Sequence, residues 1–348
     1  MNPPDALIDN CSECGSELAP GLLACPRCAR LLYGADLEKL AASAKAAAQA
    51  GDATGELASW RRAIDLLPAG TTQRKVIHDR MRALSAIVDG RQAGAPGARK
   101  RDPNGKTKAG AAAGTGAVGV ALLKSKALLA ALLANGKLLL VGLLKVPTLL
   151  SMLIYAGFWT RGGAAFGIGL VASIYVHEIG HVAALRRYGI EASAPMFIPG
   201  FGALVRLKQY PTDAHEDART GLAGPLWGLF AAAVAALVGF ALHSPTAIGV
   251  ASLGATINCF NLIPVWQLDG SRGLRALSRL ERAGVAAVGV VAGLVFHQWM
   301  PAVVGLVAGG RSFGADVTPE GDRPMTFLFG TLIAAHALIA TLPIGLGH

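Results

Sequence analysis

Residues 166–181 read FGIGLVASIYVHEIGH, an apolar run that ends in three ionisable side chains, His177, Glu178 and His181. Side chains four residues apart project from the same face of a helix, about 6 Å apart along its axis. Two imidazoles at this spacing can bind one Zn²⁺, and the glutamate between them can reach a water molecule on the metal. Ionisable groups in a membrane helix are costly unless they bind something, which disfavours a polar patch that only joins helices. The stretch therefore predicts a metal site in a membrane helix.

A third protein ligand is needed to complete such a site while one position stays open. The best candidate is Asp269, in the stretch NLIPVWQLDG at residues 261–270. Pro264 lacks an amide N–H and should open the helix there, so that backbone can line a cavity. His215 and Glu216 are rival ligands, but their segment TDAHED (212–217) is charged, and both are expected to be solvated.

Composition indicates a membrane protein. The 348 residues are 53% hydrophobic and only 16% charged, whereas a soluble domain carries about 25% charged residues. We expect an all-α polytopic membrane protein with about six transmembrane helices, preceded by a soluble N-terminal part. The expected spans approach the ~20 residues that cross a bilayer, and they cover about 146–160, 164–185, 221–242, 247–268, 283–308 and 325–346.

Charge distribution suggests the orientation. The net charge is +10, and arginines gather in the loops within 186–219 and 272–282. The positive-inside rule then puts both termini in the cytosol of a multi-pass protein of the cell or cytoplasmic membrane. No signal peptide is visible in residues 1–20, which agrees. A positive net charge is also found in regulators that bind nucleic acid. The basic segments of this chain lack aromatic residues among their lysines and arginines, so no nucleic-acid partner is expected.

Two C-x-x-C pairs near the N-terminus have the spacing of a four-thiolate zinc site. They are Cys11, Cys14, Cys25 and Cys28. Two disulfides are the alternative, which a cytosolic location disfavours. Three helices are expected next, over about 37–50, 54–67 and 72–88, with a weak likeness to a tetratricopeptide hairpin that is equally well a plain packing module.

The two membrane motifs together resemble the site-2 protease family of intramembrane metalloproteases. H-E-x-x-H lies in one span and N-x-x-P-x-x-x-L-D-G lies two spans later, and Ala223-Gly224-Pro225 matches a turn that the family shows in its middle core helix. An asparagine often found after that turn is replaced by Trp227-Gly228. The resemblance implies a three-helix catalytic core with a catalytic zinc ion on His177, His181 and Asp269, and Glu178 as general base.

That resemblance implies metal-assisted hydrolysis of peptide bonds. Glu178 would pass a proton from water to the leaving amine, and Asn261 would either donate to the developing oxyanion or only bond the helix break. The implied substrate is a membrane protein, with one span by family precedent, met within the lipid bilayer in regulated intramembrane proteolysis. The alternative is a non-proteolytic zinc-binding membrane scaffold or metal-handling protein, although Glu178 argues against it.

The chain is expected to divide into five parts. They are a zinc ribbon with a structural zinc ion (1–35), a soluble helical module open to a regulatory protein partner (36–90), a basic flexible linker (91–116), an amphipathic or re-entrant segment (117–145) and a membrane metalloprotease domain (146–348). Within the last part, Pro199-Gly200 predicts a turn and 204–207 a strand. We expect a hairpin there that either adds unwound substrate to its edge or packs as a plug.

Overall fold

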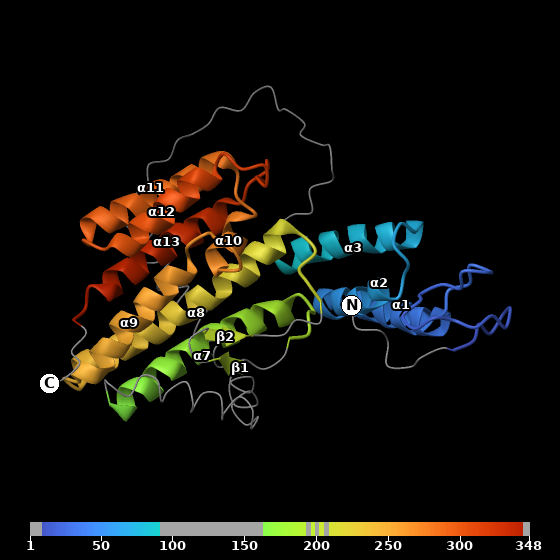
Figure 1. Cartoon of the computed structure of the whole chain (residues 1–348), viewed down its shortest axis with the longest axis horizontal. Coiled ribbons are helices and arrows are strands. Elements are labelled where there is room, and N and C mark those ends of the chain that lie inside the picture. Colours follow the sequence, from blue (N-terminus) through green and yellow to red (C-terminus); the bar gives the residue numbers. More distant parts are fainter. Residues whose placement is uncertain (1–8, 91–162, 193–195, 199–201, 205–208, 344–348) are drawn as a thin grey trace.

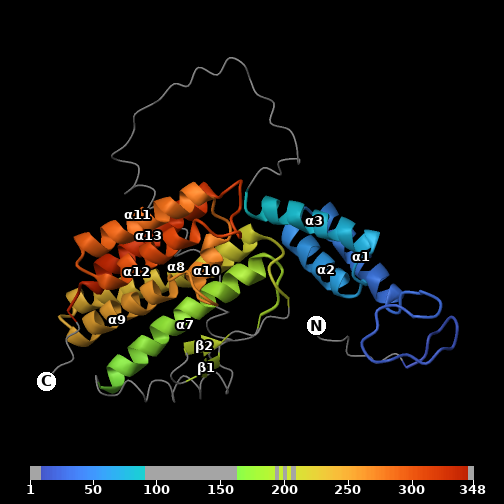
Figure 2. The ribbon, with the colours of Figure 1, turned by 45° about the horizontal axis from the view of Figure 1, so that its top comes forward.

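The computed structural model describes residues 9–90, 163–192, 196–198, 202–204 and 209–343. Figures 1 and 2 show a bundle of long helices with a smaller group of N-terminal helices at one end of it. The expectations for the linker 91–116, the segment 117–145, the span 146–160 and the turn at Pro199-Gly200 lie outside the described residues, as do the ends of the predicted strand and of the last span.

The N-terminal group consists of α1 (Gly34–Gln49), α2 (Ala53–Asp65) and α3 (Thr72–Val88). Asp52 caps α2 by accepting a hydrogen bond from the Gly55 amide, and Thr71 caps α3 in the same way through the Arg74 amide. The apolar face of this group does not close on itself. It packs against the end of α7, in one cluster formed by Leu57, Met81, Leu84, Leu185, Tyr188 and Ile190.

The membrane bundle is organised around α7 (Ala164–Arg187), α8 (Ala214–Ala241) and α9 (Pro245–Asn261), which contact one another pairwise. Small residues allow this close packing: a Cβ added to Gly180 of α7 would lie 2.6 Å from the Ala223 carbonyl of α8. In the described part of the chain, α7, α8 and the final helix α13 (Arg323–Ala340) are long and apolar enough to cross a membrane. The prediction of a helical membrane protein is thereby confirmed in its coarse form.

The predicted span 247–268 is shorter than expected. α9 ends at Asn261, and the chain runs without helix through Pro264 before the short α10 (Asp269–Leu274) begins. Trp266 adopts a positive φ of 47° in this connection. Because Pro264 cannot donate a backbone hydrogen bond, the helix ends ahead of it, and Asp269 starts a new helix instead of ending the old one.

The predicted span 283–308 is wrong. Two helices occupy this stretch, α11 (Arg279–Val295) and α12 (Trp299–Arg311), and the chain turns between them at His297, whose φ is 52°. Glycines bring the two backbones together: a Cβ on Gly289 would lie 2.6 Å from the Gly305 Cα. With 17 and 13 residues, both helices are shorter than the ~20 residues of a typical spanning helix.

A two-stranded antiparallel hairpin interrupts the helical pattern between α7 and α8. β1 (Met196–Ile198) pairs with β2 (Gly202–Leu204), with Phe197 opposite Ala203. The strand expected at 204–207 therefore starts earlier, at Gly202. Figure 2 shows the hairpin beside α7.

Candidate metal centre

Three side chains from two helices converge inside the membrane bundle. His177 and His181 lie four residues apart on α7, and Asp269 is the first residue of α10. The Asp269 carboxylate oxygens lie 3.1 Å from Nε2 of His177 and 3.2 Å from Nε2 of His181. All three residues are buried. The structure thus brings together the three residues that the sequence predicts as ligands.

Hydrogen bonds behind the imidazoles fix which nitrogen faces the centre. Nδ1 of His181 lies 2.7 Å from the Thr220 carbonyl oxygen of α8, which can only accept, so this Nδ1 carries the proton. Nδ1 of His177 lies 2.6 Å from Oδ1 of Asn258 on α9, while the Asn258 amide donates to the Gly254 carbonyl. Both Nε2 atoms therefore present lone pairs to the centre, as metal-binding histidines do.

This donor set fits a zinc ion. The two Nε2 atoms are 3.1 Å apart, close to the ~3.3 Å that separates two nitrogens at 2.0–2.1 Å from one tetrahedral zinc. Without a cation, two unprotonated nitrogens and a carboxylate would be in contact and would repel one another. A metal ion between them removes this repulsion. The three ligand atoms lie within 4.8 Å of one another. Three protein ligands leave one position for a reactant, the arrangement of catalytic zinc sites.

Glycine keeps the α8 side of the centre open. A Cβ on Gly224 would lie 2.1 Å from Nε2 of His181 and 2.7 Å from Nε2 of His177. No side chain larger than hydrogen fits there without moving the imidazoles. Gly224, part of the Ala223-Gly224-Pro225 turn that resembles the family, therefore has a steric function of its own.

Glu178 lies between the two histidines on α7 and is half-buried. Its carboxylate is within electrostatic range of His177, His181 and Asp269, and no hydrogen bond to it is found among the residues that the structure describes. Asn261, the last residue of α9, is also half-buried, and its side chain makes no hydrogen bond within the described ranges. The predicted roles of both residues thus stay predictions.

Asn258 is the residue at this centre that the sequence did not single out. It lies one turn before Asn261, in an apolar stretch where a buried amide is unusual. An amide in an apolar stretch is the sequence feature that could have indicated Asn258. No motif spacing connects position 258 with His177, which is 81 residues away.

The expectation that His215 and Glu216 are solvated is wrong. Glu216 is fully buried and pairs with Arg61 of α2, with 2.7 Å between Oε2 and Nη2. His215 is half-buried, and its Nδ1 lies 2.9 Å from Oδ2 of Asp322, which also accepts from Arg219. Burial alone would raise the pKa of Asp322, but His215 and Arg219 outweigh it and lower the pKa to about 2. Both rival ligands are thus engaged elsewhere.

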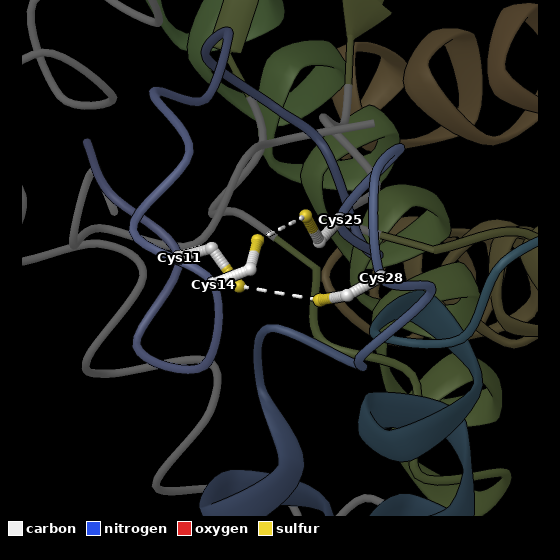
Figure 3. Close-up of side chains that lie close together, drawn as sticks. All are labelled: Cys11, Cys14, Cys25 and Cys28. Carbon is white, nitrogen blue, oxygen red and sulfur yellow. Dashed lines mark hydrogen bonds between the residues drawn. The ribbon is translucent and has the colours of Figure 1, made fainter.

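The four N-terminal cysteines form a second group of potential metal ligands. Figure 3 shows their thiols pointing toward one another. Sγ of Cys11 lies 3.6 Å from Sγ of Cys28, and Sγ of Cys14 lies 3.6 Å from Sγ of Cys25. None of the four forms a disulfide. Four thiolates brought together in this way are the donor set of a structural zinc site.

Comparison with known proteins identifies the membrane part. The profile of Peptidase family M50 matches residues 165–249, which include His177, Glu178 and His181. This stretch of the chain is similar to Peptidase family M50. The resemblance to site-2 proteases is thereby confirmed. Asp269 lies outside the matched M50 stretch, so its assignment rests on the geometry alone.

Curated relatives agree with the M50 assignment. The chain is 29% identical over 133 residues to a protein named zinc metalloprotease MJ0392 from Methanocaldococcus jannaschii, which covers 37% of each chain. It is 24% identical over 221 residues to the probable zinc metalloprotease EGY2, chloroplastic, of Arabidopsis thaliana, which covers 48% of this chain and 39% of that one. The chain thus spans little more than a third of the length of these relatives. No solved structure shows a significant match.

Proposed function

We propose that the chain is a zinc metalloendopeptidase that hydrolyses peptide bonds of membrane-embedded substrates. The observation that carries the proposal is the convergence of His177 and His181 of α7 with Asp269 of α10, with Glu178 next to them. This group lies beside α8, and α7 and α8 are both long and apolar enough to cross a bilayer. Similarity to the M50 family and the names of the relatives support the reaction class.

The protein residues divide the chemical work. His177, His181 and Asp269 would hold a zinc ion, which would supply Lewis acidity toward the scissile carbonyl. Glu178 takes a proton from the attacking water at a carboxylate oxygen and returns it to the amine nitrogen when the C–N bond breaks. Asn261 donates to the oxygen that gains charge. Asn258 and the Thr220 carbonyl hold the imidazoles in the orientation that binds metal.

The substrate would be a protein with a single membrane span, cut in regulated intramembrane proteolysis. Arginines at the end of α7 and around the start of α8 and α10 support a cytosolic location of these ends and of both termini. The active site would then lie toward the cytosolic face. A regulatory protein at the N-terminal module is a further expected partner.

Replacing Glu178 tests the proposal. Glu178→Gln should lower the cleavage rate by 10²–10⁴, the usual contribution of general base catalysis, while zinc content stays that of the parent protein. The assay uses the purified full chain in lipid nanodiscs, with a labelled single-span protein and a short unstructured peptide. Glu320→Gln, a change at an exposed position, is the matched control.

Two results would contradict the proposal. If Glu178→Gln cleaves as fast as the parent, Glu178 is not the base. If the zinc-loaded parent protein cleaves neither substrate, the alternative function as a zinc-binding scaffold or metal-handling protein becomes the better account.

A further inference from the structure

A buried arginine joins the soluble module to the membrane bundle. Arg61 of α2 is 1% exposed and Glu216 of α8 is 0% exposed, although both side chains carry charge. The guanidinium donates to three acceptors: Oε2 of Glu216 at 2.7 Å, the Tyr188 carbonyl at 2.8 Å and the Tyr210 carbonyl at 3.4 Å. The desolvation penalty of a buried ion pair offsets much of the free energy of its attraction. A contribution to overall stability therefore does not explain why this pair is buried.

Two of the three acceptors of Arg61 lie at helix ends. Tyr188 is the C-cap of α7, and Glu216 lies in the first turn of α8. A cation at a helix C-terminus and an anion at a helix N-terminus both interact favourably with the helix dipoles. One guanidinium thereby holds the end of α7 beside the start of α8.

The same two helix ends hold the metal centre together. His181 lies on α7, two turns before Tyr188, and its Nδ1 bonds the Thr220 carbonyl, one turn after Glu216 on α8. The third ligand joins through α10, because Arg272 donates to the Asp217 carboxylate and to Oγ1 of Thr220, 2.7 Å in each case. The first two turns of α8 therefore contact the soluble module on one side and the metal ligands on the other.

Further contacts hold the module in one orientation. Asp89, the C-cap of α3, forms an ion pair with Arg219, and the Gln209 amide donates to Asp65. The Gly189 backbone lies so close to α2 that an added Cβ would stand 2.7 Å from Cβ of Ala58. Together with the Arg61–Glu216 ion pair, they join the module to the bundle at several points.

We propose that Arg61 is a positioning residue for the metal centre, and that the soluble module braces α7 and α8 so that His181 and Asp269 keep their metal-binding geometry. The proposal rests on the proposed zinc-peptidase function. It gives the module a part in the catalytic unit besides any part in recruiting partners. If the contact served docking alone, its loss would lower stability and leave the metal affinity of the folded protein unchanged.

The experiment measures zinc affinity at the His177, His181 and Asp269 site in the full chain in nanodiscs. All proteins carry Cys11→Ser and Cys14→Ser, so that the ribbon does not contribute zinc. Arg61→Met removes the guanidinium and keeps the length of the apolar stem, and Arg61→Lys keeps a positive charge. Arg62→Met, an exposed neighbour on the same helix, is the matched control.

Arg61→Met should weaken zinc binding, measured by chelator competition, by about 10-fold, the lower end of the range for residues that orient metal ligands. With saturating zinc, kcat for the short peptide should fall more than KM changes, because the ligands are misplaced while the substrate contacts remain. Arg61→Lys should recover part of both losses, and Arg62→Met should match the parent. Zinc binding needs no proteolysis, so this result stands apart from the outcome with Glu178→Gln.

A double variant keeps the proposal testable if Arg61→Met fails to fold. Arg61→Met with Glu216→Leu leaves no charge buried without a partner, and such replacements often fold as well as the parent. Weakened zinc binding in the folded double variant is the expected result. Zinc affinity within twofold of the parent, in either the folded single or the double variant, would overturn the proposal, because the contact would then be needed only for docking.

Discussion

Asn258 and Gly228 act as a pair at the metal centre. A Cβ on Gly228 would stand 2.0 Å from Oδ1 of Asn258, so the amide of α9 occupies space that α8 leaves free. The sequence showed a missing asparagine after the Gly224-Pro225 turn. The structure shows an amide reaching the same surface of α8 from the neighbouring helix and bonding His177.

Removing this amide should weaken metal binding. Asn258→Ala leaves Nδ1 of His177 without its acceptor, and zinc affinity should fall about 10-fold, as it does when partners of metal-binding histidines are lost. Asn258→Asp keeps an acceptor oxygen and should retain most of the affinity. Chelator competition measures both, with Asn261→Ala as the matched control, which should keep zinc affinity while kcat falls.

Gly228→Ala should imitate the loss of Asn258, because the new methyl group displaces the amide. In a double-mutant cycle, Gly228→Ala combined with Asn258→Ala should weaken zinc binding little more than Asn258→Ala alone. Fully additive losses would mean that Gly228 acts through another contact.

At the scale of residues, the sequence predicts those ligands that stand in a recognisable motif. H-E-x-x-H places two imidazoles on one face of a helix, and Asp269 follows a proline break, so both were recognisable. The Thr220 carbonyl was not, because a backbone acceptor leaves no trace in the side-chain pattern. Glu216 is predicted to be solvated because a charged cluster has the same sequence pattern whether it is solvated or buried. Its partner Arg61 is 155 residues away in the chain, so the sequence does not indicate the pair.

At the scale of elements, hydropathy predicts one span over 283–308, but the structure has the two helices α11 and α12 there. An apolar run shows the length of a segment but not whether it reverses, and the only local signs here are His297-Gln298 and the glycines that line both helices. The turn became visible only through the packing of Gly289 against Gly305.

Gly289→Ala should destabilise the hairpin, because its Cβ would meet the backbone of α12 at 2.6 Å. Overpacking of this kind costs about 1–3 kcal/mol. Gly284→Ala, on the same helix with nothing within 4 Å, is the control, and it should be neutral or stabilise by up to about 1 kcal/mol through helix propensity. Thermal unfolding in detergent measures both. Equal melting temperatures for the two variants would contradict the backbone contact.

A further prediction concerns the hairpin of β1 and β2, to whose edge unwound substrate is expected to add. Leu204→Pro removes one backbone N–H from β2 without touching a metal ligand, and Leu204→Thr keeps that N–H. If substrate pairs with the hairpin, cleavage should fall at least 10-fold with proline and little with threonine, at unchanged zinc content. Equal cleavage by both variants would support the alternative that the hairpin only packs beside the bundle.

At the scale of the whole molecule, the described contacts join two of the five predicted parts. The N-terminal helices share an apolar cluster with the end of α7 and insert Arg61 between α7 and α8. A chain shortened to begin after residue 90 would uncover the apolar end of α7 and remove the guanidinium that bonds α7 and α8. Metal measurements on the catalytic centre are therefore better made in the full chain.

The ribbon, in contrast, should be separable from catalysis. Figures 1 and 2 show the helical module between the ribbon loops and the membrane helices. Its thiol cluster includes two buried cysteines in a segment with a very small apolar core, so metal binding should supply most of its folding free energy. Cys11→Ser with Cys14→Ser should thus remove one of two zinc ions and unfold the ribbon.

Hydrolysis of a short unstructured peptide by this double variant should stay within about twofold of the parent. Among the described residues, the contacts that position His177, His181 and Asp269 come from outside the ribbon. Cleavage of a membrane-embedded protein substrate can fall, since recruitment is the task left for the ribbon. Metal analysis and the two cleavage assays, made on the same sample, separate these effects. Loss of peptide hydrolysis while the remaining zinc ion stays bound would show that the ribbon reaches the catalytic centre, and that the brace extends beyond the helical module.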